Sequence, residues 1–291
     1  MKTIIQLFLL ALVFSACTKN NPDPAWLEIN AWDLQANPSA INPTGELSSS
    51  ISDAWVYVDN ELIGVFEVPC RVPILKSGTF DVKIFPTVLD NGISATKKIY
   101  PFLEPYETTV TLVENETATV NPDTRYYASM KFWIEDFEDA GNTIQDDPTS
   151  ATALFGVNDP TIMQATNGSK IGRVTLSTTD STWIGYTQSA TGLNLPRGED
   201  VYLEIDYYST NALVTGLLAI SSTSAPVDNP NIQMNAQDAA DIEWKKIYIE
   251  LREIITASPN ADYFEISFGA LLDAGETSGQ INIDNIKVVH F

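Results

Sequence analysis

The chain has 291 residues, and its 38 Asp and Glu against 16 Lys and Arg give a formal net charge of −22. A surface this acidic repels nucleic acid and anionic membrane, which excludes both as electrostatic partners. Because His290 is the only histidine, a multi-histidine metal centre is excluded, and a Ser-His-Asp or Cys-His site would need this near-terminal residue. The length suits two domains, each burying its own core.

The first residues have the pattern of an export signal. Lys2 precedes an apolar run over positions 4–14, and Ser15-Ala16-Cys17 follows. The run is too short to cross a bilayer as a helix, which takes about 20 apolar residues. The segment resembles a lipoprotein signal peptide with its lipobox. The resemblance implies removal of residues 1–16, lipidation of Cys17 and an outer-membrane lipoprotein. An ordinary secretory signal with an incidental cysteine is the alternative.

Residues 17–25 are predicted to be a lipidated, polar, proline-bearing tether. The segment resembles that of Bacteroidota-type lipoproteins, whose export to the cell surface uses a short acidic signal directly after the cysteine. Here Lys19, Asn20 and Asn21 come first, and acid appears only at Asp23. The sequence therefore leaves open whether the protein lies on the periplasmic or the cell-surface face of the outer membrane. With Cys17 lipidated, Cys70 has no partner for a disulfide within the chain.

Residues 26–125 read as a small domain of strands and turns. Apolar and polar residues alternate from Trp26, as in a half-buried strand. Two apolar runs, 55–58 and 62–66, flank Asp59-Asn60, which predicts a hairpin because Asp and Asn tolerate the left-handed turn conformations. A second hairpin is expected where 108–113 and 117–120 flank positions 114–116.

This stretch resembles a PEGA-type small β domain. The residues that carry the likeness are Val56-Tyr57-Val58-Asp59-Asn60, then Ile63-Gly64, then Gly78 before a strand. The family pattern has Asp-Gly where this chain has Asp59-Asn60. The resemblance implies a β-sandwich that acts as a spacer or ligand-presenting module.

Residues 131–291 are predicted to be a β-sandwich, because strands alternate with turn residues and no long helical pattern occurs. Positions 251–257 could form a short helix. The domain opens with Glu135-Asp136-Phe137-Glu138-Asp139 and closes around Asp284-Asn285. This pairing resembles the galactose-binding-like jelly roll of many carbohydrate-binding modules, which implies that the first and last strands are neighbours. The fold class is thus all-β: a small N-terminal sandwich followed by a jelly roll.

The same resemblance implies a structural calcium ion. Carried over by position, Glu138 and Asp284 are the main ligand candidates, with Asp136 and Asp139 as weaker ones. Hard oxygen ligands suit Ca²⁺, and a site joining the two ends of the domain would stabilise the sandwich. The alternative is a set of solvated acidic side chains on a turn, with Asp284 at a β-bulge.

A sugar-binding site needs exposed aromatic rings beside polar groups. The candidates are Trp183, Tyr186 and Tyr207, although core packing is the alternative for each of them. Trp244, at a strand opening, is expected to be structural. Acidic residues are so abundant that a glycosidase-like pair would occur by chance, so no catalytic residue is assigned.

The sequence thus predicts a non-catalytic, envelope-anchored lipoprotein that binds glycan through its C-terminal domain. The alternative is a protein-interaction or scaffold subunit of an outer-membrane assembly. The predicted partners are the outer membrane, through the lipid, and a polysaccharide or an envelope protein.

Overall fold

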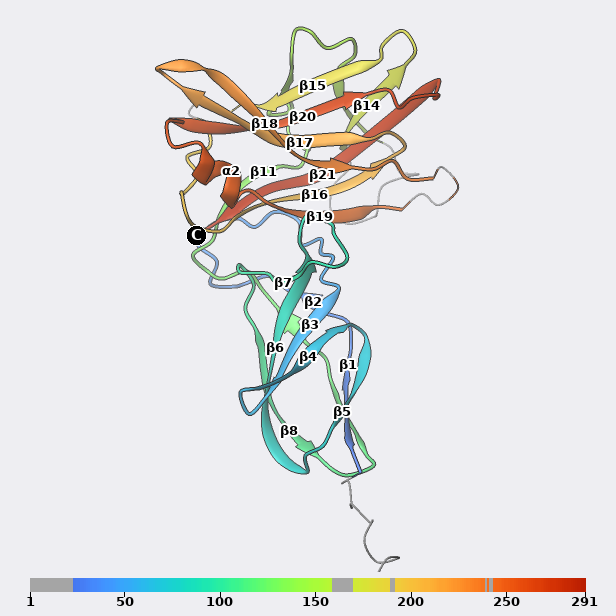
Figure 1. Cartoon of the computed structure of the whole chain (residues 1–291), viewed down its shortest axis with the longest axis vertical. Coiled ribbons are helices and arrows are strands. Elements are labelled where there is room, and N and C mark those ends of the chain that lie inside the picture. The colour runs from blue at the N-terminus through green and yellow to red at the C-terminus, as the bar shows by residue number, and fades with distance from the viewer. Residues whose placement is uncertain (1–22, 159–169, 189–191, 239, 241–242) are drawn as a thin grey trace, which may run out of the picture.

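A computed structural model describes residues 23–158, 170–188, 192–238, 240 and 243–291. These residues form two stacked β units, with the strands of the second running across the long axis of the first (Figure 1). Strands β1–β10 make up the N-terminal unit and strands β11–β21 the C-terminal unit. No helix in the described ranges is long and apolar enough to cross a membrane.

The N-terminal unit is a small sandwich of two main sheets. One sheet has the order β5 (Cys70–Ile74), β1 (Ala25–Ile29), β9 (Thr117–Val120). The other has the order β4 (Glu61–Glu67), β3 (Asp53–Val58), β6 (Gly78–Leu89), and β6 also pairs with β7 (Lys97–Ile99) and β8 (Tyr106–Leu112). A short ladder joins β2 (Asp33–Leu34) to β10 (Asp123–Thr124).

The turn chemistry predicted for this unit is confirmed once and wrong once. Asp59 and Asn60 both have positive φ and close the β3–β4 hairpin. The second hairpin does not form, because β8 pairs with β6 while β9 pairs in parallel with β1. The chain therefore crosses from one sheet to the other at Asn115 (φ 63°). Alternation within each strand cannot distinguish a hairpin from such a crossing.

The C-terminal unit has two antiparallel sheets packed face to face. The first, called sheet D here, has the order β13 (Leu154–Val157), β14 (Ile171–Ser177), β21 (Ser278–His290), β16 (Val201–Ser209), β19 (Lys245–Glu250). The second, sheet F, has the order β12 (Ile144–Asp146), β15 (Thr182–Thr187), β20 (Tyr263–Leu271), β17 (Leu213–Ser221), β18 (Ser224–Met234).

Several expectations for this unit are confirmed. Its first strand β11 (Lys131–Glu135) pairs with its last strand β21, as the resemblance implies. The short helix α2 spans Arg252–Ala257. Strand β18 was missed because it is polar and contains Pro226 and Pro230, which is typical of an edge strand. The all-β class, with a small sandwich followed by a jelly roll, is therefore the fold of the chain.

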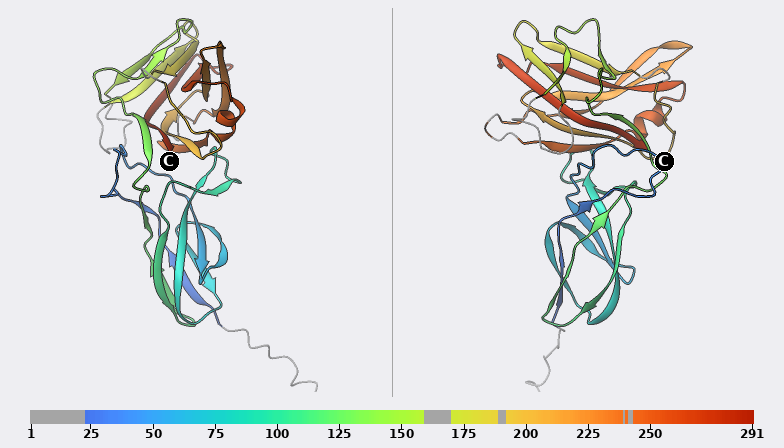
Figure 2. Two further views of the ribbon diagram at one scale, coloured as in Figure 1. Left: turned by 90° about the vertical axis from the view of Figure 1, so that its left-hand side faces the viewer. Right: turned by 180° about the vertical axis from the view of Figure 1, so that it is seen from behind.

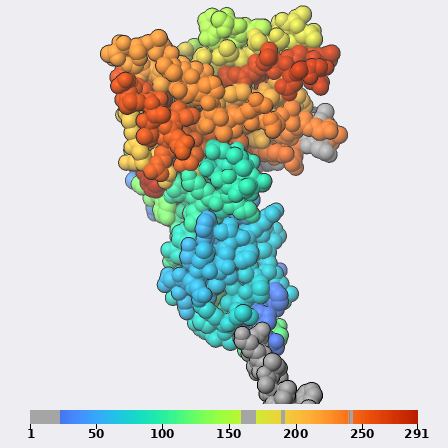
Figure 3. Space-filling view, in the orientation of Figure 1, coloured from blue at the N-terminus to red at the C-terminus, as the bar shows by residue number. Residues whose placement is uncertain are grey.

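The two units meet on the outer face of sheet D. Besides the cores of the two units, an apolar cluster lies there. It combines Tyr100, Phe102 and Tyr126 of the N-terminal unit with Tyr202 and Tyr248 of the jelly roll. The β6–β7 turn reaches the edge strand β19, and the two units form one continuous surface there (Figures 2 and 3). The first described residues lie at the opposite end of the N-terminal unit (Figure 1).

Candidate functional site

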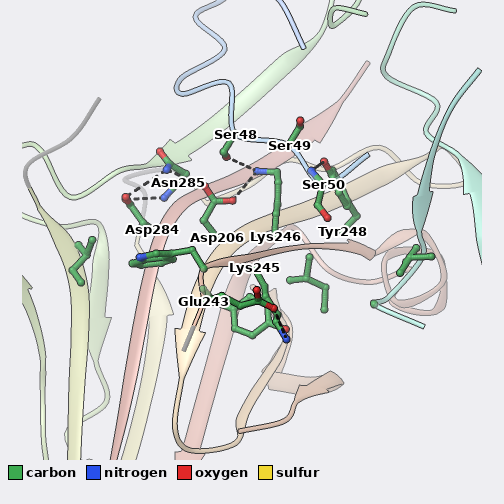
Figure 4. Close-up of a pocket in the computed structure, with 16 residues that line it drawn as sticks. Ser48, Ser49, Ser50, Asp206, Glu243, Lys245, Lys246, Tyr248, Asp284 and Asn285 are labelled. Carbon is green, nitrogen blue, oxygen red and sulfur yellow. Dashed lines mark hydrogen bonds and ion pairs between the residues drawn. The ribbon is translucent and has the colours of Figure 1, made fainter. Parts of the chain in front are cut away.

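The candidate site is a cavity of about 530 Å³ at the junction of the two units (Figure 4). Strands β16, β19 and β21 of sheet D, with Ile171 of β14 and the two residues before β19, provide most of its wall. The segment 48–50 and the β6–β7 turn of the N-terminal unit provide the rest. The cavity is therefore bounded by residues from widely separated parts of the chain.

A β-bulge shapes the sheet wall. Opposite the single residue Ile205 on β16, strand β21 carries Asn285 and Ile286. Asn285 has φ 46°, a left-handed conformation that Asn tolerates better than most residues. Bulges redirect side chains, and here Asp284 and Asn285 both line the cavity.

The polar groups of the wall form a connected set (Figure 4). Lys246 Nζ lies 3.1 Å from Glu204 Oε2 and 3.2 Å from Asp206 Oδ1, and it donates to Ser48 Oγ at 3.1 Å. The other carboxylate oxygen of Asp206 accepts from Asn285 Nδ2 at 3.0 Å. Burial alone would lower the pKa of Lys246, but Glu204 and Asp206 outweigh it and raise the pKa above its usual value.

Asp284 is held differently from Asp206. Its carboxylate accepts from the backbone N–H of Asn285 at 2.8 Å, and it has no ion pair within the described part of the chain. Burial raises the pKa of Asp284 to about 8, and the nearby carboxylates of Asp206, Asp136 and Glu138 add to the rise. The cavity wall thus contains a carboxyl group without a compensating cation.

Three aromatic residues line the same cavity: the buried Tyr248, Trp244 and Tyr207. Trp244 lies directly before β19 and is partly exposed, and Tyr207 lies near the end of β16. The ring of Tyr207 also packs against the jelly-roll core, and burial raises the pKa of its hydroxyl. Of the aromatic candidates predicted from the sequence, Tyr207 is the one that the structure places at this cavity.

The other two aromatic candidates lie on sheet F. The prediction of Trp183 as a sugar-stacking ring is wrong, because its side chain is fully buried in the core. The ring stacks on Phe268, and the indole N–H donates to Asp146. Tyr186 is partly exposed on strand β15 of the same sheet. It lies on the opposite sheet of the sandwich from the cavity on sheet D.

The predicted calcium ligands are only partly brought together. Asp136 and Glu138 lie near enough to Asp284 to affect its pKa, whereas Asp139 is exposed and contributes its backbone oxygen to Lys170. Glu138 Oε1 accepts from the backbone N–H of Lys170 at 2.7 Å. Among the described residues, no three acidic, Cys or His side chains are grouped closely enough to hold a metal ion. Calcium stays a prediction.

Cys17 and the residues up to 22 lie outside the described residues, so lipidation also stays a prediction. Four residues of the cavity were missed as candidates: Ser48, Asp206, Trp244 and Lys246. Segment 48–50 belongs to no strand and has no periodic pattern. The one available signal was the cluster Glu243-Trp244-Lys245-Lys246, where an aromatic residue lies among charges.

No protein-family profile matches this chain, and no curated protein matches it. Solved structures that match part of this chain include carbohydrate-binding modules. A family 28 module specific for non-crystalline cellulose is 18% identical, over 52% of this chain and 91% of its own, with a TM-score of 0.38. A family 27 module from Caldicellulosiruptor saccharolyticus, in complex with mannohexaose, is 12% identical over 54% and 96%, with a TM-score of 0.37.

A longer structure matches over a similar share of this chain. It contains the family 22 module and catalytic module of a Clostridium thermocellum xylanase, complexed with xylohexaose. The identity is 14%, over 54% of this chain and 28% of that one, with a TM-score of 0.37. This chain thus spans little more than a quarter of that structure. At such TM-scores these likenesses carry no functional argument.

Proposed function

We propose that this protein is a non-catalytic glycan-binding protein whose ligand occupies the cavity on sheet D. The observation that carries the proposal is the lining of that cavity. Trp244 and Tyr207 lie beside carboxylates, an amide, a lysine and serine hydroxyls in a space of about 530 Å³. Apolar ring faces of sugars stack on aromatic side chains, and their hydroxyls need donors and acceptors close together.

The polar lining supports binding rather than catalysis. Asp206 accepts hydrogen bonds from Lys246 and Asn285, so both of its carboxylate oxygens are already engaged. Asn285 Nδ2 also lies 3.4 Å from Asp284 Oδ2, so its amide joins the two carboxylates. A glycosidase instead needs two carboxyl groups that face each other across the scissile bond. Held in this way, the Asp284 carboxyl is suited to form hydrogen bonds with the hydroxyls of a bound sugar.

The proposal includes a membrane anchor. Lipid on Cys17 would attach the chain to the outer membrane at its N-terminal end. The first described residues lie at the end of the N-terminal unit that is farthest from the jelly roll, which supports this orientation (Figure 1). An anchor there would place the cavity away from the membrane, where it can reach a polysaccharide.

The first experiment is a glycan array probed with the purified protein, followed by calorimetric titration of the oligosaccharide with the strongest signal. Trp244→Ala should weaken binding at least tenfold, about 1.4 kcal/mol, because it removes the stacking surface. Tyr186→Ala is the matched control, since it removes a partly exposed aromatic ring from the opposite sheet. It should bind as tightly as the wild type.

Two results would contradict the proposal in different ways. Loss of binding in Tyr186→Ala, with Trp244→Ala unaffected, would move the glycan site to sheet F. Absence of any signal from the wild-type protein on a broad array would reject glycan binding. The protein-interaction function in an envelope assembly would then be the one to pursue.

A further inference from the structure

The N-terminal unit contributes more than contact area to the cavity. Segment 46–50 lies along the outer face of sheet D and is held there by three side chains of the jelly roll. Lys246 Nζ donates to Ser48 Oγ at 3.1 Å, and the backbone N–H of Ser50 donates to Tyr248 Oη at 3.0 Å. Lys287 Nζ donates to the backbone oxygen of Glu46. The segment is thus fixed beside the cavity although it belongs to no strand.

A second contact fixes the β6–β7 turn, another part of the wall. The β6–β7 turn extends the exposed edge of sheet D, where residue 90 forms a bridge with Tyr248 on β19. Asn91 N–H donates to the Tyr248 carbonyl at 2.8 Å, and its side-chain oxygen accepts from the N–H of Glu250 at 3.0 Å. Gly92, next in the turn, lines the cavity. Backbone hydrogen bonds of this kind place the turn with little freedom.

Between these contacts lies a buried anchor. Glu204 on β16 is fully buried and accepts hydrogen bonds from Tyr100 Oη at 2.6 Å and Tyr126 Oη at 2.8 Å, both from the N-terminal unit. A buried carboxylate without its donors is costly, so these bonds favour one arrangement of the two units. The two sides of the cavity are therefore held in a fixed relation before any ligand arrives.

We infer that the N-terminal unit is part of the binding site, with the hydroxyls of Ser48–Ser50 contacting a glycan whose sugar ring lies against Trp244. This inference rests on the proposed function and gives the N-terminal unit a role beyond that of a spacer. The ligand implied by this inference is a glycan chain that contacts both units at once. Serine hydroxyls both donate and accept, so they match sugar hydroxyls in either orientation.

The test is a bulky residue placed on the N-terminal wall. Ser49 is exposed and lines the cavity, and none of the hydrogen bonds described above uses its side chain. Ser49→Trp should fill the space and weaken binding of the strongest array oligosaccharide at least tenfold, with an unchanged melting temperature. Ser39→Trp is the matched control, an exposed serine of the same unit outside the cavity.

The outcomes distinguish the role of the N-terminal unit from glycan binding itself. Wild-type affinity in Ser49→Trp, together with loss in Trp244→Ala, would overturn the role of the N-terminal unit and leave glycan binding intact. Equal loss in Ser39→Trp and Ser49→Trp would also overturn it, because the effect would then not depend on the cavity. If the wild-type protein binds no array glycan, the proposed function fails and this inference fails with it.

Discussion

On the outer face of sheet D, two buried carboxyl groups have pKa values shifted in opposite directions. Where the N-terminal unit covers sheet D, Glu204 has two tyrosine donors and Lys246. Burial pushes the pKa of Glu204 up, but Lys246, Lys287 and the tyrosines outweigh burial and lower it. Where the face opens into the cavity, burial and neighbouring carboxylates raise the pKa of Asp284 to about 8.

The difference arises from what covers the face. Glu204 and Asp206 alternate on one strand and point the same way, but only Glu204 lies under the tyrosines of the N-terminal unit. In the covered part, the carboxylate of Glu204 is fully bonded within the protein and joins the two units. The open part still has bonding capacity, which makes it the part suited to a sugar or a cation.

The largest effect is expected from breaking the covered side. Glu204→Ala leaves Lys246 and Lys287 buried with less compensating charge, and removing one partner of a buried pair typically costs about 3–5 kcal/mol. Denaturant unfolding should show a loss of this size. The matched control is Glu107→Ala, which breaks the exposed pair with Lys83 and should cost about 0–1 kcal/mol. Similar losses in both variants would mean that Glu204 is no anchor.

A smaller loss is expected from removing one donor to the same carboxylate. Tyr126 Oη lies 2.8 and 3.0 Å from the two oxygens of Glu204, and Tyr126→Phe removes both contacts while keeping the ring. Hydrogen bonds to charged groups contribute about 1.5–3 kcal/mol, so unfolding should be easier by that amount. Tyr57→Phe, on a partly exposed ring of the N-terminal unit, should be near neutral. An unaffected Tyr126→Phe would contradict the anchor.

The sequence predicts the features of the fold that depend on local pattern. Alternation identifies strands such as β16 and β21, and the Asp59-Asn60 turn identifies one hairpin correctly. The resemblance carried by the segments around Glu135 and Asp284 correctly pairs the first strand of the jelly roll with the last. Each of these features is set by residues close together in the chain or by a recognisable motif.

The sequence does not predict which outer faces are covered. On β16 both faces are buried, since the core covers one and the N-terminal unit the other, so the Glu204 side of the strand carries no sign of its burial. Trp183 and Trp244 likewise look alike as sequence, yet one is in the core and the other lines a cavity. Such distinctions depend on contacts between distant segments, as with Ser48 and Lys246.

On the open side, the pH dependence of stability tests Asp284. Its pKa is 3.8 in the reference state and about 8 in the folded protein, so between these values the folded state holds a proton that the unfolded chain releases. The stabilising contribution is complete below pH 3.8 and is lost as the pH rises through about 8. Wild-type stability should therefore fall over this interval, measured by denaturant unfolding in chelator.

Asp284→Asn removes the titrating group and should flatten that fall. At pH 8 the variant should be more stable than the wild type by about 2 kcal/mol. This is less than the full shift at about 1.4 kcal/mol per pKa unit, since water enters the open cavity. Asp139→Asn, on an exposed carboxylate, should follow the wild type. Parallel curves for Asp284→Asn and the wild type would show that the open side is as well compensated as the covered one.

The smallest effect is expected from calcium. A cation at Asp284 would supply the positive charge that the covered side receives from Lys246. At a free concentration ten times its Kd, an ion bound only by the folded state adds about 1.4 kcal/mol of stability. The melting temperature should therefore rise with calcium and fall with chelator in the wild type and Asp139→Asn, but not in Asp284→Asn. An unchanged wild-type melting temperature and no calcium uptake would reject the ion. The open carboxylates would then be left to a glycan alone.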